Sequence, residues 1–257
     1  MGTSPSKVVM VTGAAAGIGL ACCKRFASEG YGIVINDIPG KALDKVVSEF
    51  SDTGTQHMVI PGDISSPEIT QEISDSIAST WGRVDALIAN AGVQDAGGIL
   101  DTDDTHWSRV ISVNLMGVAH ASKAILPFML EQGGGALVMI ASVNAVTGCA
   151  GMAAYDASKN AVLGLMRSLA IDYGANNVRV NAISPGNTLT DYHINRMAQS
   201  GIGIDELRDM TRGYGLLERA AEPAEIASAA YFLCSNEASF ITGHNMVVDG
   251  GYSLQKS

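Results

Sequence analysis

The sequence has little positive charge. Its 257 residues carry 16 Lys and Arg against 26 Asp and Glu, which gives a formal net charge of -10 at pH 7. Nucleic-acid binding depends on clustered cations that release counterions from the phosphate backbone. This charge balance therefore excludes nucleic acid as a partner.

Cysteines are few as well, and their spacing matches no metal or disulfide pattern. No C-x-x-C pair and no nearby set of Cys and His is available to hold zinc. We therefore predict no metal and favour a reduced, cytoplasmic setting. The four cysteines are Cys22, Cys23, Cys149 and Cys234.

Long hydrophobic segments are also missing. The first residues, MGTSPSKVVMV, lack the basic region and cleavage site of a secretory signal, and no uninterrupted apolar run approaches the thickness of a bilayer. We expect a protein that stays in water and has no membrane partner.

Short apolar runs rich in β-branched residues do recur, and they alternate with stretches of helical periodicity. The predicted strands are Val8–Val11, Ile33–Ile35, Met58–Ile60, Ala86–Ala89, Ala136–Ile140, Val178–Ile183 and Met246–Val248. The predicted helices are Ile18–Glu29, Lys41–Phe50, Ile69–Trp81, Trp107–Leu130, Ala154–Tyr173 and Ala224–Leu233.

This alternation predicts an α/β fold. Uninterrupted apolar strands indicate a Rossmann-type, doubly wound parallel sheet of about seven strands with helices on both faces. Without an internal repeat or a linker, we expect one domain over 1–257. Residues 187–217 make too long a segment for an ordinary connection, and we interpret them as a substrate lid.

A glycine-rich turn follows the first predicted strand. Thr12–Gly19 reads TGAAAGIG, with the spacing GxxxGxG. Such glycines let the backbone approach a pyrophosphate at a helix N-terminus, where free N–H groups and the helix dipole favour an anion. A tight turn that binds nothing is the alternative interpretation.

Asp37 ends the second predicted strand, where a carboxylate can accept both hydroxyl protons of an adenosine ribose. It would repel a 2′-phosphate, and the neighbouring Asn36, Ile38 and Pro39 include no cation. The position favours NAD over NADP. A surface Asp in a turn is the alternative.

Tyr155 and Lys159 lie four residues apart on one predicted helix and therefore share a face. An adjacent ammonium favours the phenolate, so Lys159 is expected to make Tyr155 a usable general acid or base. Ser142 follows the fifth strand, where it can donate to a carbonyl oxygen or cap a turn. Asn114, within an apolar helix, either caps a kink or holds water.

The combined pattern resembles the short-chain dehydrogenase/reductase family over essentially the whole chain. The matching segments are TGAAAGIG at 12–19, GDI at 62–64, NAG at 90–92, SVN at 112–114, Ser142, YDASK at 155–159, VNAISPG at 180–186 and DGG at 249–251. The resemblance implies a metal-independent, NAD-dependent alcohol dehydrogenase or ketone reductase.

Site roles follow from that resemblance. It implies catalysis by Asn114, Ser142, Tyr155 and Lys159, with Asn114 holding a water of a proton path. It implies that NAD is bound by Gly13, Ala16, Gly17, Ile18, Gly19, Asp37, Ile38, Asp63, Ile64, Asn90, Ala91, Gly92, Tyr155, Lys159, Pro185, Gly186, Thr188 and Thr190. It also implies a homotetramer formed through the helices that carry Asn114 and Tyr155 and through the C-terminal strand with its preceding helix.

The substrate is expected to be a small molecule such as a sugar, a cyclic polyol or a steroid alcohol. Candidate pocket residues are Gln94, Asn144, Val146, Met152, Asn187, Tyr192, His193 and Tyr214. Three other functions stay open at this point. They are a 3-oxoacyl carrier-protein reductase, a non-catalytic dinucleotide-binding sensor, and a methyltransferase that uses a similar glycine-rich turn.

Overall fold

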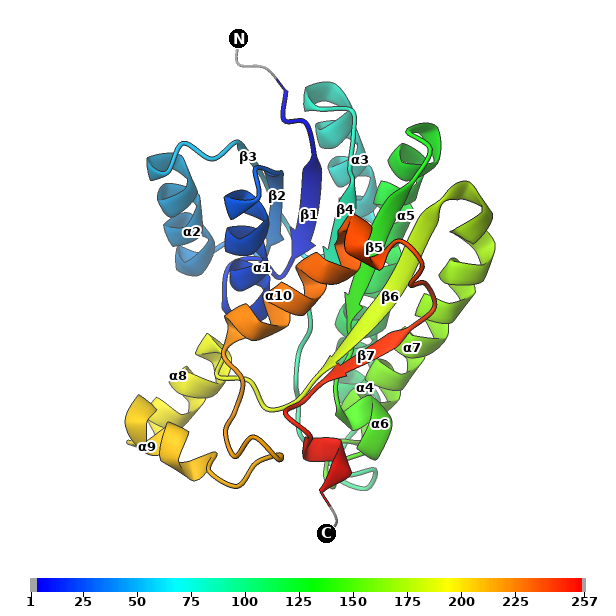
Figure 1. Cartoon of the computed structure of the whole chain (residues 1–257). Coiled ribbons are helices and arrows are strands. Elements are labelled where there is room, and N and C mark those ends of the chain that lie inside the picture. The colour runs from blue at the N-terminus through cyan, green and yellow to red at the C-terminus, as the bar shows by residue number, and fades with distance from the viewer. Residues whose placement is uncertain (1–3, 256–257) are drawn as a thin grey trace.

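Residues 4–255 are described by a computed structural model, in which seven strands form one parallel sheet (Figure 1). The strands lie in the order β3-β2-β1-β4-β5-β6-β7. They are β1 (Val8–Thr12), β2 (Gly32–Asp37), β3 (His57–Pro61), β4 (Ala86–Ala89), β5 (Gly135–Ile140), β6 (Val178–Pro185) and β7 (Asn245–Val248). Each predicted apolar run lies within one of them, and the predicted fold class is confirmed.

The central strands are buried on both faces. Every residue of β1 and β4 is buried, whereas β7 at the edge of the sheet is only partly buried. Helices on both faces leave no side of a central strand to water, so its side chains do not alternate between apolar and polar. This is why uninterrupted apolar runs identified the strands.

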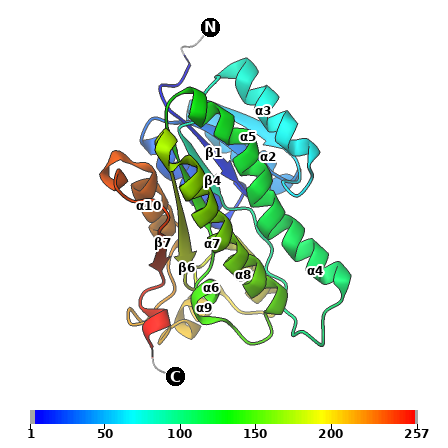
Figure 2. The ribbon, with the colours of Figure 1, turned by 90° about the vertical axis from the view of Figure 1, so that its right-hand side faces the viewer.

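Two helical layers enclose the sheet. In one layer, Ile73 and Ile125 pack in the same apolar cluster as Met10 of β1. In the other layer, Phe26 and Ile226 pack in a second cluster. The first layer consists of α3 (Glu68–Thr80), α5 (Gly117–Glu131) and α7 (Ala153–Tyr173), which Figure 2 shows facing the viewer. The second consists of α1 (Gly17–Ser28), α2 (Lys41–Asp52) and α10 (Pro223–Cys234).

The helix predicted over Trp107–Leu130 is interrupted, which corrects the sequence expectation. It comprises α4 (Asp104–Ile111), a π-helical turn at Ser112–Met116, and α5. The extra residue of a π turn leaves the apolar pattern on either side intact, so periodicity does not reveal it. By length and composition the run Asp104–Glu131 is apolar enough to cross a membrane, but 56% of its most apolar window is buried inside the protein, as in a core helix.

The long segment after β6 is partly helical. It contains α8 (Asp191–Gln199) and α9 (Ile204–Met210), two helices that were not among those predicted. Leu189, Leu207 and Ala220 form a small apolar cluster of their own beneath these helices. The segment is therefore a packed subdomain beside the sheet. A further short helix, α6 (Asn144–Thr147), follows β5.

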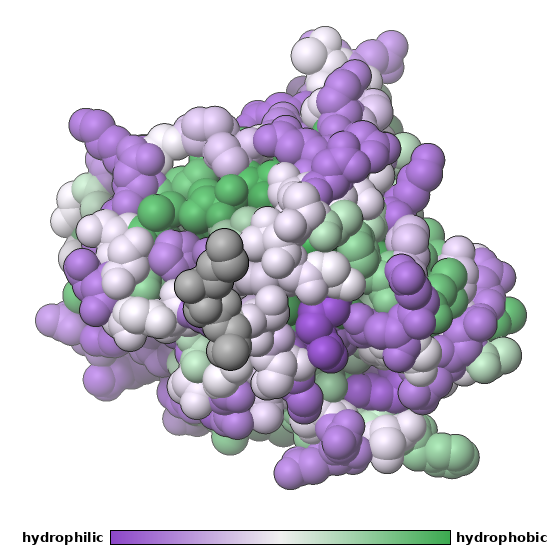
Figure 3. Space-filling model, turned by 90° about the horizontal axis from the view of Figure 1, so that it is seen from above, coloured by the Kyte–Doolittle hydropathy of each residue, from purple (hydrophilic) through white to green (hydrophobic). Residues whose placement is uncertain are grey.

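The carboxyl ends of the strands meet at one end of the sheet, the lower end in Figure 1. There β1 lies between β2 and β4. The chain runs from β1 to β2 and β3 on one side and then crosses back to β4 on the other, and this reversal of strand order opens a crevice. Figure 3 shows the opposite end of the molecule, where polar side chains dominate the outline. The predicted motifs all lie near the carboxyl ends.

Candidate active site

Close backbone contacts require the glycines between β1 and α1. Gly13 has a φ of +63°, and a Cβ atom there would lie 2.8 Å from the Cα of Ala91. A Cβ atom at Gly19 would overlap the carbonyl oxygen of Gly13. The turn can therefore bring the first turn of α1 into the crevice only with glycine at these positions.

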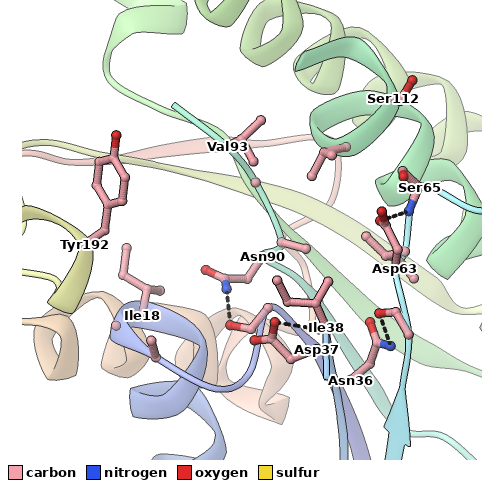
Figure 4. A pocket seen from close by; sticks show the side chains of 18 of the residues that line it. Ile18, Asn36, Asp37, Ile38, Asp63, Ser65, Asn90, Val93, Ser112 and Tyr192 are labelled. Atoms are coloured by element: carbon pink, nitrogen blue, oxygen red, sulfur yellow. Dashed lines mark hydrogen bonds between the residues drawn. The ribbon is translucent and has the colours of Figure 1, made fainter. Parts of the chain in front are cut away.

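A cavity of about 540 Å³ opens in front of this turn (Figure 4). Most of the residues predicted to bind the coenzyme line it. These are Gly13, Ala16, Gly17, Ile18, Asp37, Ile38, Asp63, Ile64, Asn90, Ala91, Gly92 and Thr190. Gly19 is not part of the wall and instead supports the turn from within α1.

Asp37 lies at the end of β2 on the wall of this cavity. Its carboxylate accepts hydrogen bonds from the backbone nitrogens of Ala15 and Ile38 at 2.7 and 2.8 Å. These bonds hold the acid next to the glycine-rich turn, with the exposed Ile38 as its neighbour. The position suits an acceptor for ribose hydroxyls, and Ile38 offers no cation to a phosphate.

Asn90 ties β4 to β1. Its Nδ2 donates to the carbonyl oxygens of Thr12 and Gly13, both at 3.0 Å. The hydroxyl of Thr12 in turn accepts from the backbone nitrogens of Asn90 and Ala91. The NAG segment therefore forms the floor of the crevice, and Figure 4 shows Asn90 between the glycine-rich turn and Val93.

The N-terminus of α1 contacts a negatively charged side chain. The backbone nitrogen of Gly17 donates to the carboxylate of Asp191 at 2.8 Å. A carboxylate on a free N–H at a helix N-terminus occupies the kind of position that a phosphate takes. Together with the glycine cradle and Asp37, this contact shows that the residues present fit a dinucleotide.

A second cavity of about 330 Å³ adjoins the first, and Ile18, Asn90, Gly92 and Thr190 line both. It brings together the predicted reaction site and the remaining predicted coenzyme contacts. The predicted residues that line it include Ser142, Tyr155, Lys159, Pro185, Gly186, Thr188, Gln94, Asn144, Asn187, Tyr192 and His193.

Lys159 is buried beneath Tyr155. Its Nζ donates to the carbonyl oxygen of Ile140 at 2.9 Å and lies 5.8 Å from the centre of the Tyr155 ring. A Cβ atom at Gly92 would lie 3.3 Å from this Nζ, so a glycine keeps the ammonium accessible from the cavity. Burial lowers the pKa of Lys159 to about 8.

The surroundings of Tyr155 shift its pKa upward. Burial of the phenol is the main cause, hydrogen bonding to Ser142 opposes it, and the negative charge of Asp156 adds to it. This direction is opposite to the one expected from the neighbouring ammonium. The physical reason is that burial of the phenol outweighs the effect of the ammonium, whose Nζ lies 5.8 Å from the ring centre and donates to Ile140.

Asn114, in the π-helical turn, is buried and its amide is engaged. Its oxygen accepts from the backbone nitrogen of Val93 at 2.7 Å, and its Nδ2 donates to the Val93 carbonyl and to Ser158, both at 3.0 Å. Ser158 in turn donates to the carbonyl oxygen of Tyr155. The side chain thus joins the NAG segment to the helix of Tyr155, and its role in a water path stays a prediction.

Residues of α8 cover the second cavity. The hydroxyl of Tyr192 donates to the carbonyl oxygen of Gln94 at 3.1 Å, and the His193 ring lies within hydrogen-bond distance of the Gln94 amide oxygen and the Thr188 carbonyl. These contacts hold α8 over the cavity, and the lid function of 187–217 stays a prediction. Three candidate substrate residues do not line this cavity, namely Val146, Met152 and Tyr214. Tyr214 lines a separate cavity of about 90 Å³ together with Asn187.

Several residues at the site were not found by sequence reasoning. Arg109 lines both cavities and forms an ion pair with Asp95 at 2.7 Å. Asp191 and Asp156 bond to backbone groups of the site. Charged residues on helices usually face solvent, so their type and position gave no sign of a role in the site. The groups that bond to these three residues lie far away in the sequence or on a loop without a recognised motif.

Comparisons with known proteins agree with this geometry. A profile of the family described as enoyl-(acyl carrier protein) reductase matches residues 13–253. Meso-2,3-butanediol dehydrogenase from Serratia marcescens is 38% identical over 96% of this chain and 94% of its own length.

Solved structures are similar over the same extent. A 7α-hydroxysteroid dehydrogenase in complex with NADH and 7-oxo glycochenodeoxycholic acid has a TM-score of 0.86 and 34% identity, covering 96% of this chain and 94% of that one. L-sorbose reductase from Gluconobacter frateurii, in complex with NADPH and L-sorbose, has a TM-score of 0.91 and 30% identity, covering 99% of both chains.

Proposed function

This chain belongs to the short-chain dehydrogenase/reductase family, and on that basis we propose that it interconverts a small secondary alcohol and its ketone with NAD as the preferred coenzyme. The observation that carries the proposal is the convergence of Ser142, Tyr155 and Lys159 on one cavity that adjoins a dinucleotide-shaped crevice. Relatives of this chain are oxidoreductases of secondary alcohols, sugars and steroids.

The chemistry of the chain's own residues is proton transfer and orientation. When bound, an oxidised nicotinamide ring would accept a hydride from the alcohol carbon and would bring a positive charge that favours the Tyr155 phenolate. Tyr155 takes the hydroxyl proton during oxidation and returns it during reduction. Ser142 holds the substrate oxygen. Its own oxygen accepts from the backbone nitrogen of Asn144 at 3.2 Å, so its hydroxyl proton remains available to donate.

The preference for NAD follows from Asp37 and Ile38. A carboxylate held beside the glycine-rich turn accepts hydrogen bonds from ribose hydroxyls and repels a 2′-phosphate. The same carboxylate opposes the 3-oxoacyl carrier-protein reductase alternative, which the sequence resemblance associates with NADP.

The cavity favours a small, polar substrate. A volume of about 330 Å³ lies at the low end for ligand pockets, and its wall contains four amides, those of Asn90, Gln94, Asn144 and Asn187. Diols, hydroxy ketones and small sugars fit these properties better than a steroid.

We also propose a cytoplasmic homotetramer. An apolar groove of about 340 Å³ runs between the outer faces of α5 and α7, lined by residues that include Leu126, Leu165 and Leu169. A contiguous apolar groove of this kind is typical of a subunit interface. All four cysteines are free, including the exposed Cys149, which fits a reducing compartment.

The decisive test is turnover with and without the phenol oxygen. Purified protein and NAD are mixed with a panel of diols, sugars and cyclic alcohols, and reduced coenzyme is followed by its absorbance. Tyr155→Phe should lower kcat by at least about a hundredfold, the usual contribution of general acid-base catalysis. Turnover that survives at the wild-type rate in Tyr155→Phe would refute the proposed role of Tyr155. No turnover of any alcohol or ketone would remove the proposal and leave the coenzyme-sensor alternative.

A further inference from the structure

The residue that follows Tyr155 holds part of the substrate cavity in place. Asp156 lies on the first turn of α7, and its two carboxylate oxygens have separate partners. Oδ1 accepts from Nδ2 of Asn144 at 2.8 Å, and Oδ2 accepts from the backbone nitrogen of Cys149 at 2.7 Å. Asp156 therefore connects α7, the helix of Tyr155, to the segment that follows Ser142.

This contact fixes which way the Asn144 amide faces. A carboxylate only accepts hydrogen bonds, so the nitrogen of the amide must face Asp156 and the oxygen must face away. Among residues 4–255 that oxygen accepts no hydrogen bond, and Asn144 lines the cavity that contains Ser142 and Tyr155. The backbone nitrogen of Asn144 also donates to the Ser142 hydroxyl, which places this residue next to the reacting group.

We propose that Asp156 is a positioning residue that presents the Asn144 amide oxygen to the substrate and thereby selects substrates with a hydroxyl beside the reacting carbon. The inference rests on the proposed hydride transfer and narrows its substrate class to vicinal diols and α-hydroxy ketones. A second hydroxyl donates to the fixed oxygen. A carbonyl or ether at that position has no proton to donate and leaves the amide oxygen without a partner.

A single substitution should turn the amide around. In Asp156→Asn only one oxygen remains at position 156, and the Cys149 N–H still requires an acceptor. The new amide nitrogen then faces Asn144 and can only donate, so the Asn144 oxygen turns toward it and the Asn144 nitrogen turns to the cavity. The polarity offered to the substrate is reversed while size is unchanged.

The test uses ketones of equal size that differ in this one group. Acetoin is compared with diacetyl, and 2-hydroxycyclohexanone with 1,2-cyclohexanedione, each reduced with NADH. The measured quantity is the hydroxyketone preference, defined as kcat/KM for the hydroxy ketone divided by kcat/KM for the matching diketone. Intrinsic reactivity of the carbonyl cancels when this ratio is compared between variants.

The expected result is a fall in the hydroxyketone preference of at least about fivefold in Asp156→Asn, the effect of one hydrogen bond. Asn144→Ala removes the oxygen without touching Asp156 and should lower the ratio similarly. In the Asn144→Ala background, adding Asp156→Asn should change the ratio by less than about twofold, because Asp156 acts through Asn144. Asp172→Asn, an exposed acid on the same helix, is the matched control and should behave as wild type.

Two results would overturn the inference. A purely structural role for Asp156 would lower kcat/KM for both ketones equally and leave the ratio at its wild-type value. A wild-type enzyme that reduces none of the four ketones, yet shows Tyr155-dependent turnover of another alcohol, would refute the substrate class alone. Absence of Tyr155-dependent turnover with every alcohol and ketone would instead refute the proposed function.

Discussion

At the scale of single residues, burial controls the charges of the reaction site. Lys159 is the only lysine among residues 4–255 that is buried, and burial lowers its pKa to about 8 while raising that of Tyr155. Burial thus disfavours the charged form of both groups. A positive charge bound in the adjoining crevice would favour the phenolate, which couples proton transfer to occupancy of the coenzyme site.

Lys159→Met tests the burial of this charge through stability. An ordinary lysine titrates near 10.5, so between pH 8 and 10.5 the unfolded chain holds the Lys159 proton more often than the folded chain, and the contribution of Lys159 to the free energy of unfolding should rise with pH. The rise attributable to Lys159 is about 3 kcal/mol over the whole window. Lys159→Met should lack it in urea unfolding at pH 7 and pH 10.

The control for that experiment is Lys41→Met, which alters an exposed lysine on α2 and should keep the wild-type dependence. Parallel curves for wild type and Lys159→Met would contradict a lowered pKa for the buried ammonium.

The coenzyme preference that we propose depends on two neighbouring side chains. Asp37→Ala removes the acid that repels a 2′-phosphate, and Ile38→Arg adds a cation beside it. The double variant should raise the ratio of kcat/KM with NADP to that with NAD by at least about tenfold, the worth of one charge-assisted hydrogen bond. Comparing Asp37→Ala alone with the double variant separates the effect of removing the acid from the effect of adding the cation. An unchanged ratio would reject a selective role for Asp37.

At the scale of elements, the segment 187–217, which we propose as a lid, and the crevice beside the glycine-rich turn are connected through α8 and α1. Asp191 at the start of α8 accepts from the Gly17 nitrogen of α1, and Tyr192 in the next position bonds to Gln94 across the substrate cavity. The π-helical turn provides a similar link, because Asn114 joins the segment after β4 to α7. Through each link, one helical segment contacts both the wall of the dinucleotide crevice and the wall of the second cavity.

Asp191→Asn should tighten coenzyme binding. The carboxylate lies at the helix N-terminus that fits a pyrophosphate, and like charges there repel. We expect KM for NAD to fall about threefold at low salt, and the difference from wild type to shrink in 0.5 M NaCl because salt screens exposed charges. The exposed Asp172→Asn again serves as the control. A raised KM would show that the contact helps to build the crevice instead.

At the scale of the whole molecule, apolar surface remains after the sheet and its helices are packed. Besides the groove between α5 and α7, Phe240 after α10 and Val247 in β7 are exposed. These surfaces lie on the elements that the family resemblance assigns to subunit contacts. No other part of residues 4–255 covers these exposed apolar surfaces.

Leu169→Arg tests the groove as an interface. A charge placed against an apolar partner surface is costly to bury, so the variant should form dimers where wild type forms tetramers. Light scattering coupled to size exclusion measures the mass of each. Leu100→Arg alters a leucine that is 95% exposed and outside the groove, and it should leave the mass unchanged. A monomeric wild type, or a Leu169→Arg tetramer, would reject the proposed assembly.

Much of the fold was readable from the sequence because its signals are local. Apolar runs such as Val8–Val11 are buried on both faces, and the glycines at 13 and 19 are required by contacts within a few residues or at the neighbouring strand. The π-helical turn and the helices of 187–217 were missed because they change the geometry of a segment without changing its apolar pattern. Met152 and Tyr214 were placed at the cavity from their position in the chain, which does not determine side-chain direction.

The sequence by itself determined the seven strands along the chain, the glycine cradle and the choice of candidate reacting groups, since each depends on residue type and short spacing. Tertiary structure alone decided the electrostatics and polarity of the site. The burial that raises the pKa of Tyr155, the carboxylate of Asp191 on α1 and the orientation of the Asn144 amide by Asp156 all arise from contacts that form only when distant segments pack together.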